Sequence, residues 1–145
     1  MTEVAFHFNV PDKLGYACRL VRKATGAGAR VVVTGDADLL RSLDQLLWTF
    51  SALEFVPHCH AAAADARTLA ASPVVLADSP RSTPHHQVLV SLGSQMPEGF
   101  ERFERLIELV ARDDGDRQQA RARWKHYADR GYAIKTHDLG AKETG

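Results

Sequence analysis

The chain of 145 residues lacks the features that mark exported, membrane-spanning or disulfide-stapled proteins. Its two cysteines, Cys18 and Cys59, match neither a zinc ribbon nor a secreted disulfide framework, so a reducing cytosol is the simplest compartment. No apolar run approaches about 18 residues, and Met1 is not followed by a charged and then apolar leader. We therefore expect a cytoplasmic protein that is neither exported nor embedded in a membrane.

An excess of charge of either sign is also absent. Lys and Arg total 18, Asp and Glu total 18, and the formal net charge is zero. The chain as a whole has no electrostatic attraction to a nucleic acid backbone, so any basic site must be local. The length suits one domain with a true core. We predict one domain over residues 1–140, followed by a polar tail at 141–145.

Signatures of nucleotide, metal and nucleophilic chemistry are missing as well. The first strand-to-helix turns, Asn9–Leu14 and Thr34–Ala37, carry neither G-x-G-x-x-G nor the Gly-Lys-Ser/Thr of a P-loop. His58–His60 and the pair His85 and His86 offer zinc-type side chains without a suitable ligand spacing. The pair of Cys59 and a neighbouring histidine lacks an orienting third group. We predict no catalytic residue, no metal site and no cofactor.

The alternative is a small cytosolic α/β enzyme, dependent on a nucleotide or a metal, with an unknown substrate. Such an enzyme needs a phosphate-binding strand-to-helix turn or converging carboxylates. The two turns named above show neither.

Short apolar segments alternate with amphipathic ones along the chain. The pattern predicts strands at Val4–Asn9, Arg30–Thr34, Glu54–Pro57, Pro73–Ala77, Gln87–Leu92 and Tyr132–Lys135. It predicts helices from Pro11 to about Thr25, over Ala37–Phe50, from Met96 to the Asp113 region, and over Arg117–Arg130. His60–Ala71 is either a loop or a weak helix. The expected fold is a single-domain three-layer α/β/α sandwich with a mostly parallel sheet, Rossmann-like without the nucleotide-binding fingerprint.

Trp48 lies off the apolar face of its predicted helix. The stripe that should face the sheet contains Leu39, Leu40, Leu43, Leu46, Leu47 and Phe50. At about 100° per residue, Trp48 falls roughly 140° from the centre of that stripe. The strand expected next ends at Pro57, which cannot donate to a sheet ladder and so favours a peripheral position. We predict an exposed indole that contacts a partner.

The last predicted helix places cations beside an apolar row. Arg117, Arg121 and Lys125 recur every four residues, and the neighbouring row contains Ala120, Trp124, Tyr127 and Ala128. Residues 117–130 contain five cationic side chains and one carboxylate, and this local excess of positive charge favours an acidic partner. Two other interpretations are a solvated helix whose Trp124 packs into the core, and direct binding of nucleic acid. The neutral net charge argues against the second.

These segments resemble the chi subunit family of the bacterial DNA polymerase III holoenzyme. The resemblance rests on Leu43-Asp44-x-x-Leu47-Trp48, on Phe55-Val56-Pro57-His58, and on Ala120-Arg121-x-Arg123-Trp124-Lys125-x-Tyr127 before Gly131-Tyr132. It implies a non-catalytic accessory subunit of the clamp-loader assembly. Such a subunit pairs with the psi subunit, binds the acidic C-terminal tail of the single-stranded DNA-binding protein, and contacts nucleic acid only indirectly.

The resemblance also implies two sets of site residues. The psi-facing surface would comprise Trp48, Phe55, Val56 and Pro57, and the tail pocket would comprise Val110, Arg117, Arg121, Trp124 and Lys125. This chain departs from the family at Trp124, where Tyr is common, and at Arg117, where Lys is familiar. A tail ending in aspartates, a phenylalanine and a free carboxylate needs cations beside an apolar slot. We expect Arg121 to bind the carboxylate, because its guanidinium can hold two oxygens.

Overall fold

The computed structural model describes residues 1–49, 57–61 and 64–140. The predicted polar tail at 141–145 lies outside these ranges, as do Phe50, Phe55 and Val56. The described strands are β1 (Glu3–Val10), β2 (Val31–Thr34), β3 (His58–His60), β4 (Val74–Leu76), β5 (Val88–Ser91), β6 (Arg105–Ala111) and β7 (Ile134–Asp138). The helices are α1 (Lys13–Gly26), α2 (Ala37–Thr49), α3 (Ala66–Ala71) and α4 (Asp114–Asp129), with 3-10 turns η2 (Pro80–Ser82) and η3 (Phe100–Arg102).

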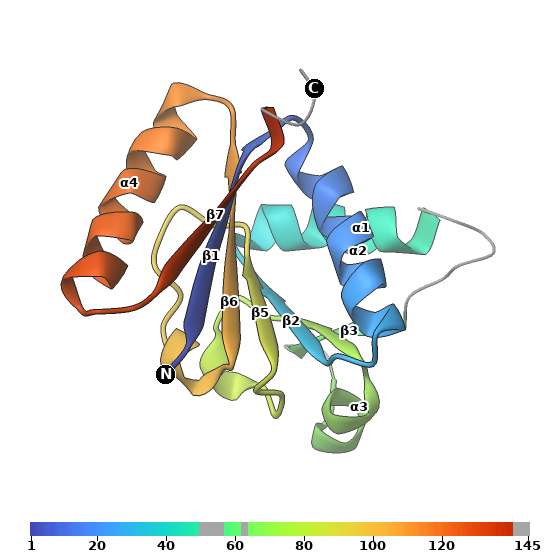
Figure 1. The fold of residues 1–145 in the computed structure, drawn as a ribbon. Coiled ribbons are helices and arrows are strands. Elements are labelled where there is room, and N and C mark those ends of the chain that lie inside the picture. The colour runs from blue at the N-terminus through green and yellow to red at the C-terminus, as the bar shows by residue number, and fades with distance from the viewer. Residues whose placement is uncertain (50–56, 62–63, 141–145) are drawn as a thin grey trace.

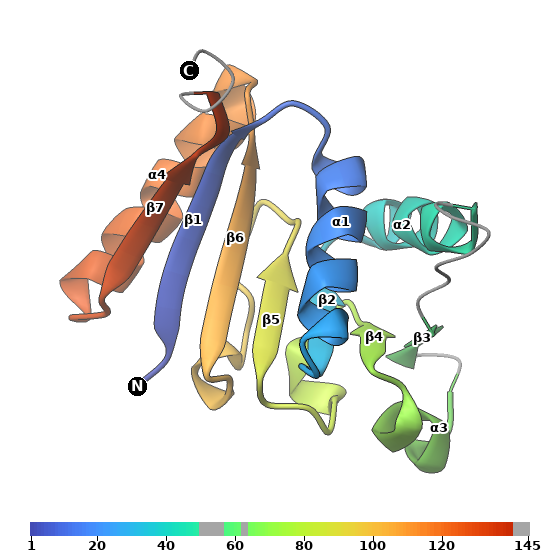
Figure 2. The same cartoon turned by 45° about the vertical axis from the view of Figure 1, so that its right-hand side comes forward.

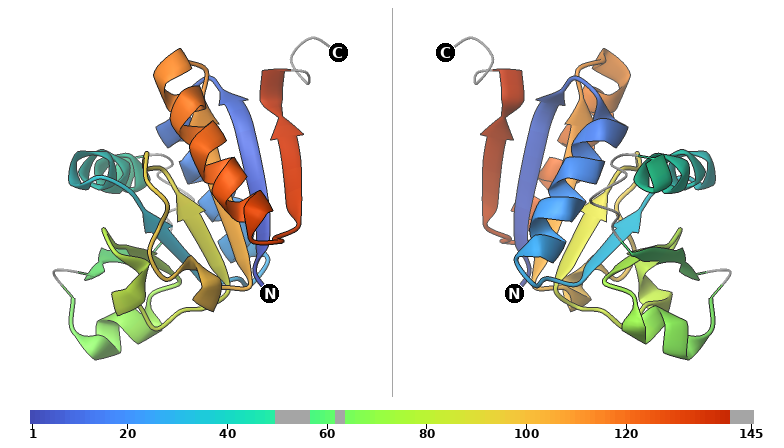
Figure 3. Two further views of the ribbon diagram at one scale, coloured as in Figure 1. Left: turned by 90° about the vertical axis from the view of Figure 1, so that its left-hand side faces the viewer. Right: turned by 90° about the vertical axis from the view of Figure 1, so that its right-hand side faces the viewer.

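The described strands form one sheet in the order β3-β4-β2-β5-β6-β1-β7, and every pairing in it is parallel. Helices α1 and α2 cover one face, and α4 covers the other (Figures 1 and 3). This confirms the predicted α/β/α sandwich. β3 and β7 are the two edges, so the segment that follows Pro57 is peripheral, as its proline indicates.

Aspartates begin the two long helices that flank the sheet. Asp12 precedes α1 and accepts a hydrogen bond from the Gly15 amide, and Asp113 does the same for the Asp116 amide before α4. Asp116 itself accepts from the Ala111 amide at 2.7 Å and pairs with Lys13 at 2.8 Å. These bonds join the start of α4 to the start of α1 across the end of the sheet.

Apolar side chains form a separate core on each face of the sheet. One core lies between the sheet and the helices α1 and α2, and its buried members include Cys18, Val21, Leu43 and Leu47. The other lies beneath α4 and η3 and centres on Phe6, Phe100, Phe103, Leu106 and Tyr127. Strands that contribute to both cores, such as β6, are buried on both sides.

The predicted helix from Met96 is wrong. Its second half is β6, the strand between β5 and β1, and its first half is a loop with η3. A central parallel strand is apolar on both faces, so its hydrophobic pattern matches that of a helix as well as that of a strand. Glu108, which the helical pattern places in solvent, is fully buried.

The other predicted elements differ from the structure mainly at their ends. The final strand begins at Ile134 and runs to Asp138, later than the predicted Tyr132–Lys135. The small-residue segment after His60 contains the six-residue α3, capped by Asp65. The third strand is described only from His58, so its predicted extent, Glu54–Pro57, falls almost wholly outside the described residues.

Candidate functional site

Helix α4 is fixed to the sheet by a buried polar cluster of Glu108, Arg123 and Tyr127. The Tyr127 hydroxyl donates to Glu108 Oε2 at 2.6 Å, and Arg123 Nε donates to the same oxygen at 3.0 Å. A second Arg123 nitrogen, Nη1, donates to the carbonyl of Ser94 at 2.7 Å. Burial raises the pKa of Glu108, an effect opposed by the Arg123 charge, and burial together with Glu108 raises the pKa of Tyr127. The cluster sets which face of α4 turns outward.

The basic surface of α4 is therefore smaller than the sequence count suggests. Arg123 belongs to the buried cluster and does not face a partner. The exposed cations are Arg117, Arg121, Lys125 and Arg130. Counting Arg123 in the surface patch was wrong, because its charge is already matched by Glu108.

Beside these cations lies an apolar cavity of about 270 Å³ between α4 and the strands β1, β6 and β7. Its lining residues are Phe6, Phe8, Val110, Arg117, Ala120, Arg121, Trp124 and Thr136. Trp124 is 37% exposed, and its ring centroid lies 5.1 Å from that of Phe6. The cavity thus has aromatic and aliphatic walls with two guanidinium groups along one side.

Four of the five residues expected in the tail pocket line this one cavity, namely Val110, Arg117, Arg121 and Trp124. Lys125 is exposed on the same helix and is not among the lining residues. Val110 comes from β6, so it reaches the cavity from a strand and not from the helix that the sequence predicted.

Sequence reasoning missed four lining residues: Phe6, Phe8, Ala120 as a wall, and Thr136. Phe6 and Phe8 are two residues apart on β1, so they share one face of the strand. That alternation is visible in the sequence. Their position opposite α4 is not, because it depends on β1 lying between β6 and β7.

The second predicted surface lies at the opposite edge of the sheet. Trp48 is 61% exposed at the end of α2, while Leu43 and Leu47 on the same helix are buried, which confirms that the indole points away from its own core. Its ring lies 5.4 Å from the His58 ring, and His58 is hydrogen-bonded to Asp44 at 2.9 Å.

The bond between Asp44 and His58 joins two of the three segments on which the resemblance rests. Pro57 is exposed next to His58. Phe55 and Val56 lie outside the described residues, so the described part of this surface consists of Trp48 and Pro57.

Three findings bear on the other functional classes. Lys13, in the first strand-to-helix turn, donates to the carbonyl of Leu92 and pairs with Asp116, so it is engaged within the fold. Within residues 1–49, 57–61 and 64–140, no three His, Cys, Asp or Glu side chains are grouped to hold a metal ion. In the same ranges no helix has the length and apolarity needed to cross a bilayer.

Fold and surface together define an α/β protein with an apolar, cation-flanked cavity under its last helix. The family model described as DNA polymerase III chi subunit, HolC, matches residues 1–135. The chain is 33% identical over 145 residues to the DNA polymerase III subunit chi of Pseudomonas aeruginosa, covering 96% of this chain and 98% of that protein. The chain belongs to the DNA polymerase III chi subunit family, which confirms the resemblance seen in the sequence.

Two further relatives carry the same name. The DNA polymerase III subunit chi of Haemophilus influenzae is 26% identical over 126 residues, covering 86% of this chain and 85% of that protein. The one from Escherichia coli is 29% identical over 121 residues, covering 82% and 80%.

Proposed function

We propose that this chain is a non-catalytic, cytoplasmic accessory subunit that links the clamp-loader assembly to the single-stranded DNA-binding protein. It binds the acidic C-terminal tail of that protein in the cavity beneath α4 and pairs with the psi subunit through the Trp48 and Pro57 surface. The observation that carries the proposal is the cavity itself, an apolar slot flanked by Arg117 and Arg121.

The size and chemistry of the cavity suit the end of such a tail. Ligand pockets for whole small molecules measure roughly 300–1,000 Å³, so a space of about 270 Å³ suits a single buried side chain better than a complete nucleotide. A phenylalanine ring placed there contacts Phe6, Val110 and Trp124. The terminal carboxylate then lies at the guanidinium edge of the cavity.

The exposed cations of α4 bind different parts of the tail. Arg121 binds the terminal carboxylate through its two-pronged guanidinium. Arg117 and the exposed Lys125 attract the aspartates upstream, which speeds encounter more than it adds affinity. At this surface of α4, nucleic acid is then contacted only through the single-stranded DNA-binding protein.

The test is calorimetry with a peptide that ends in aspartates, a phenylalanine and a free carboxylate. Arg121→Ala should weaken binding by about 1.5–3 kcal/mol, the range for a hydrogen bond to a charged group. Arg130→Ala is the matched control, because Arg130 is an exposed cation at the end of the same helix outside the cavity lining.

A C-terminally amidated peptide completes the design as a double-mutant cycle. It should bind the unmodified chain more weakly than the free-acid peptide, and it should lose little more affinity with Arg121→Ala. Equal binding of the two peptides to the unmodified chain would remove Arg121 as the carboxylate ligand.

A further inference from the structure

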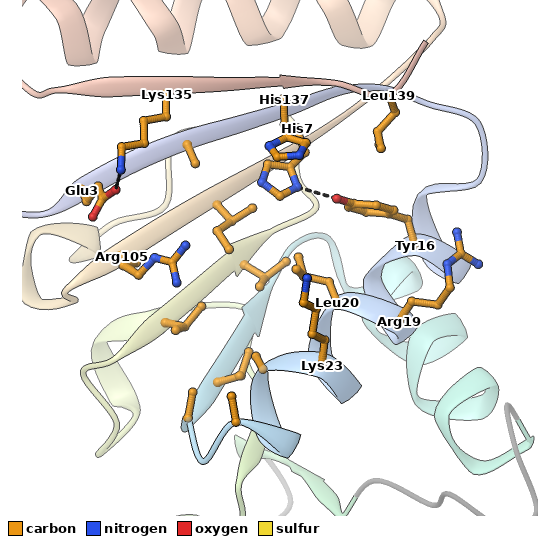
Figure 4. Close-up of a pocket in the computed structure, with 18 of the residues that line it drawn as sticks. Glu3, His7, Tyr16, Arg19, Leu20, Lys23, Arg105, Lys135, His137 and Leu139 are labelled. Carbon is orange, nitrogen blue, oxygen red and sulfur yellow. Dashed lines mark hydrogen bonds and ion pairs between the residues drawn. The ribbon is translucent and has the colours of Figure 1, made fainter. Parts of the chain in front are cut away.

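The described helices cover only part of the sheet on the face that carries α1. On this face, β7 and the neighbouring β1 lie beyond the edge of α1 (Figures 2 and 3). Parallel sheets ordinarily have helices over both faces. Here the uncovered strands and the side of α1 enclose a groove of about 680 Å³ (Figure 4).

The floor of this groove is apolar and its margins are cationic. Ala5, Val90 and Ile107 form part of the floor, and Leu20 of α1 forms part of the wall. Four cations line it: Arg19 and Lys23 from α1, Arg105 from β6, and Lys135 from β7. In Figure 4 they stand on different sides of the floor.

Negative charge is scarce in the groove. Glu3 is the one carboxylate among its described lining residues, and it pairs with Lys135 at 2.5 Å. The pKa of Glu3 is lowered by its hydrogen bond to Lys135 and by that charge. Because Lys135 is paired with Glu3, the groove has an excess of three positive charges, from Arg19, Lys23 and Arg105, in a chain with no net charge.

Three rings lie at the end of the groove away from Glu3. His7 Nδ1 and the Tyr16 hydroxyl are hydrogen-bonded at 2.6 Å, and the His7 and His137 ring centroids lie 4.9 Å apart (Figure 4). The Arg19 guanidinium lies 6.0 Å from the Tyr16 ring centroid. Rings beside cations offer both a stacking surface and a phosphate contact.

We propose that this groove binds a nucleotide, with the phosphate held by the cations and the base against the rings and the apolar floor. Its volume falls within the usual range for such ligands, unlike that of the cavity under α4. A free nucleotide and a nucleotide within a single strand share this chemistry, and the experiment separates them. The groove lies on the opposite face of the sheet from α4, so the proposal does not rest on tail binding.

The experiment measures fluorescence anisotropy of a labelled oligothymidylate with the full chain at low salt, with thymidine triphosphate as an unlabelled competitor. The double variant Arg19→Glu/Lys23→Glu should weaken binding about tenfold or more. The matched control is Arg41→Glu/Arg67→Glu, which makes the same change in net charge at exposed positions outside the groove and should bind as the unmodified chain does. Arg105→Glu repeats the test from the sheet side should the α1 variant not fold.

The competitor identifies the source of the nucleotide. Displacement by thymidine triphosphate at comparable concentrations indicates a free nucleotide, and displacement by unlabelled strand alone indicates a single strand. Three results would overturn the proposal: no binding of the labelled oligothymidylate, equal losses in the two double variants, or displacement by oligoglutamate as effective as by nucleotide. Loss of binding with Arg121→Ala would move the nucleotide to α4 and overturn it as well.

Discussion

At the scale of single residues, Cys18 shows what burial does to chemistry. Its side chain lies within the core under α1, and burial raises its pKa to about 11. The thiolate is the reactive form, so Cys18 should resist iodoacetamide at about pH 8 in the folded chain, whereas the partly exposed Cys59 should react. Mass spectrometry before and after denaturation measures both sites.

The variant Cys59→Ser isolates Cys18 for this measurement. Alkylation of the folded variant at the rate of a denatured sample would contradict the burial of Cys18.

Trp48 provides a second test at this scale. Because the indole is 61% exposed, Trp48→Ala should change the free energy of unfolding by no more than about 1 kcal/mol, the size of its ring contact with His58. Pairing with the psi subunit should weaken strongly, as measured by co-purification. The neighbour Leu47 is buried, so Leu47→Ala should cost about 2–5 kcal/mol. If Trp48→Ala were as unstable as Leu47→Ala, the indole would be a core residue.

Residue positions were predictable where a regular pattern determines them. The phase of the leucines on α2 was enough to place Trp48 outside the core. Arg123 was misjudged, because a charged side chain in a basic helix is assigned to solvent unless its buried partner is known. That partner, Glu108, lay in a segment whose fold the sequence did not reveal.

At the scale of elements, the bonds of Glu108 to Arg123 and Tyr127 hold α4 against β6. Glu108→Leu leaves the Arg123 charge buried without its carboxylate and should cost about 3–5 kcal/mol. The paired change Glu108→Leu/Arg123→Met removes both charges and should cost much less than the single changes Glu108→Leu and Arg123→Met added together. Urea unfolding of the four chains gives the coupling free energy. Effects that add to within about 0.5 kcal/mol would show that the two residues act independently.

Helices α1 and α4 were predicted near their observed positions, whereas the segment that forms β6 was predicted as a helix. An aspartate caps the start of each of these two helices, and α1 also has a regular apolar stripe; these are local signals. β6 has no local signal, because Leu106, Ile107, Leu109 and Val110 face two cores at once. Which of two regular structures such a run adopts is decided by its neighbours β5 and β1, and these are distant in sequence.

The candidate cavity was predictable to the same extent. The row of Arg117 and Arg121 beside Trp124 follows from helical spacing alone. Phe6, Phe8 and Thr136 enter the cavity because the sheet order places β1 and β7 under α4. The spacing of residues in the sequence does not predict the order of the strands in the sheet.

At the scale of the whole molecule, the net charge of zero means that salt should affect peptide binding much more than it affects the stability of the fold. Raising NaCl from about 0.1 M to about 1 M shortens the Debye length from about 10 Å to about 3 Å. Affinity for the tail peptide should fall, because Arg117, Arg121 and Lys125 act through exposed charge. The midpoint of thermal unfolding should shift little. Calorimetry and thermal denaturation at the two salt concentrations make the comparison.

Arg117→Ala should flatten the salt dependence of binding by removing one of these charges. An affinity that did not change with salt would mean that the apolar slot alone holds the peptide.

The place of β1 in the sheet has a consequence for synthesis of the chain. Val4 lies opposite Leu106 on one side and Ile134 on the other, so β1 is synthesised before both of its neighbours, which lie in the last third of the chain. Roughly 100 residues lie between β1 and its first neighbour, β6. At a synthesis rate of about 5–20 residues per second, β6 is therefore made on the order of ten seconds after β1. During that interval an apolar strand bearing Phe6 and Phe8 is open to pairing with other nascent chains.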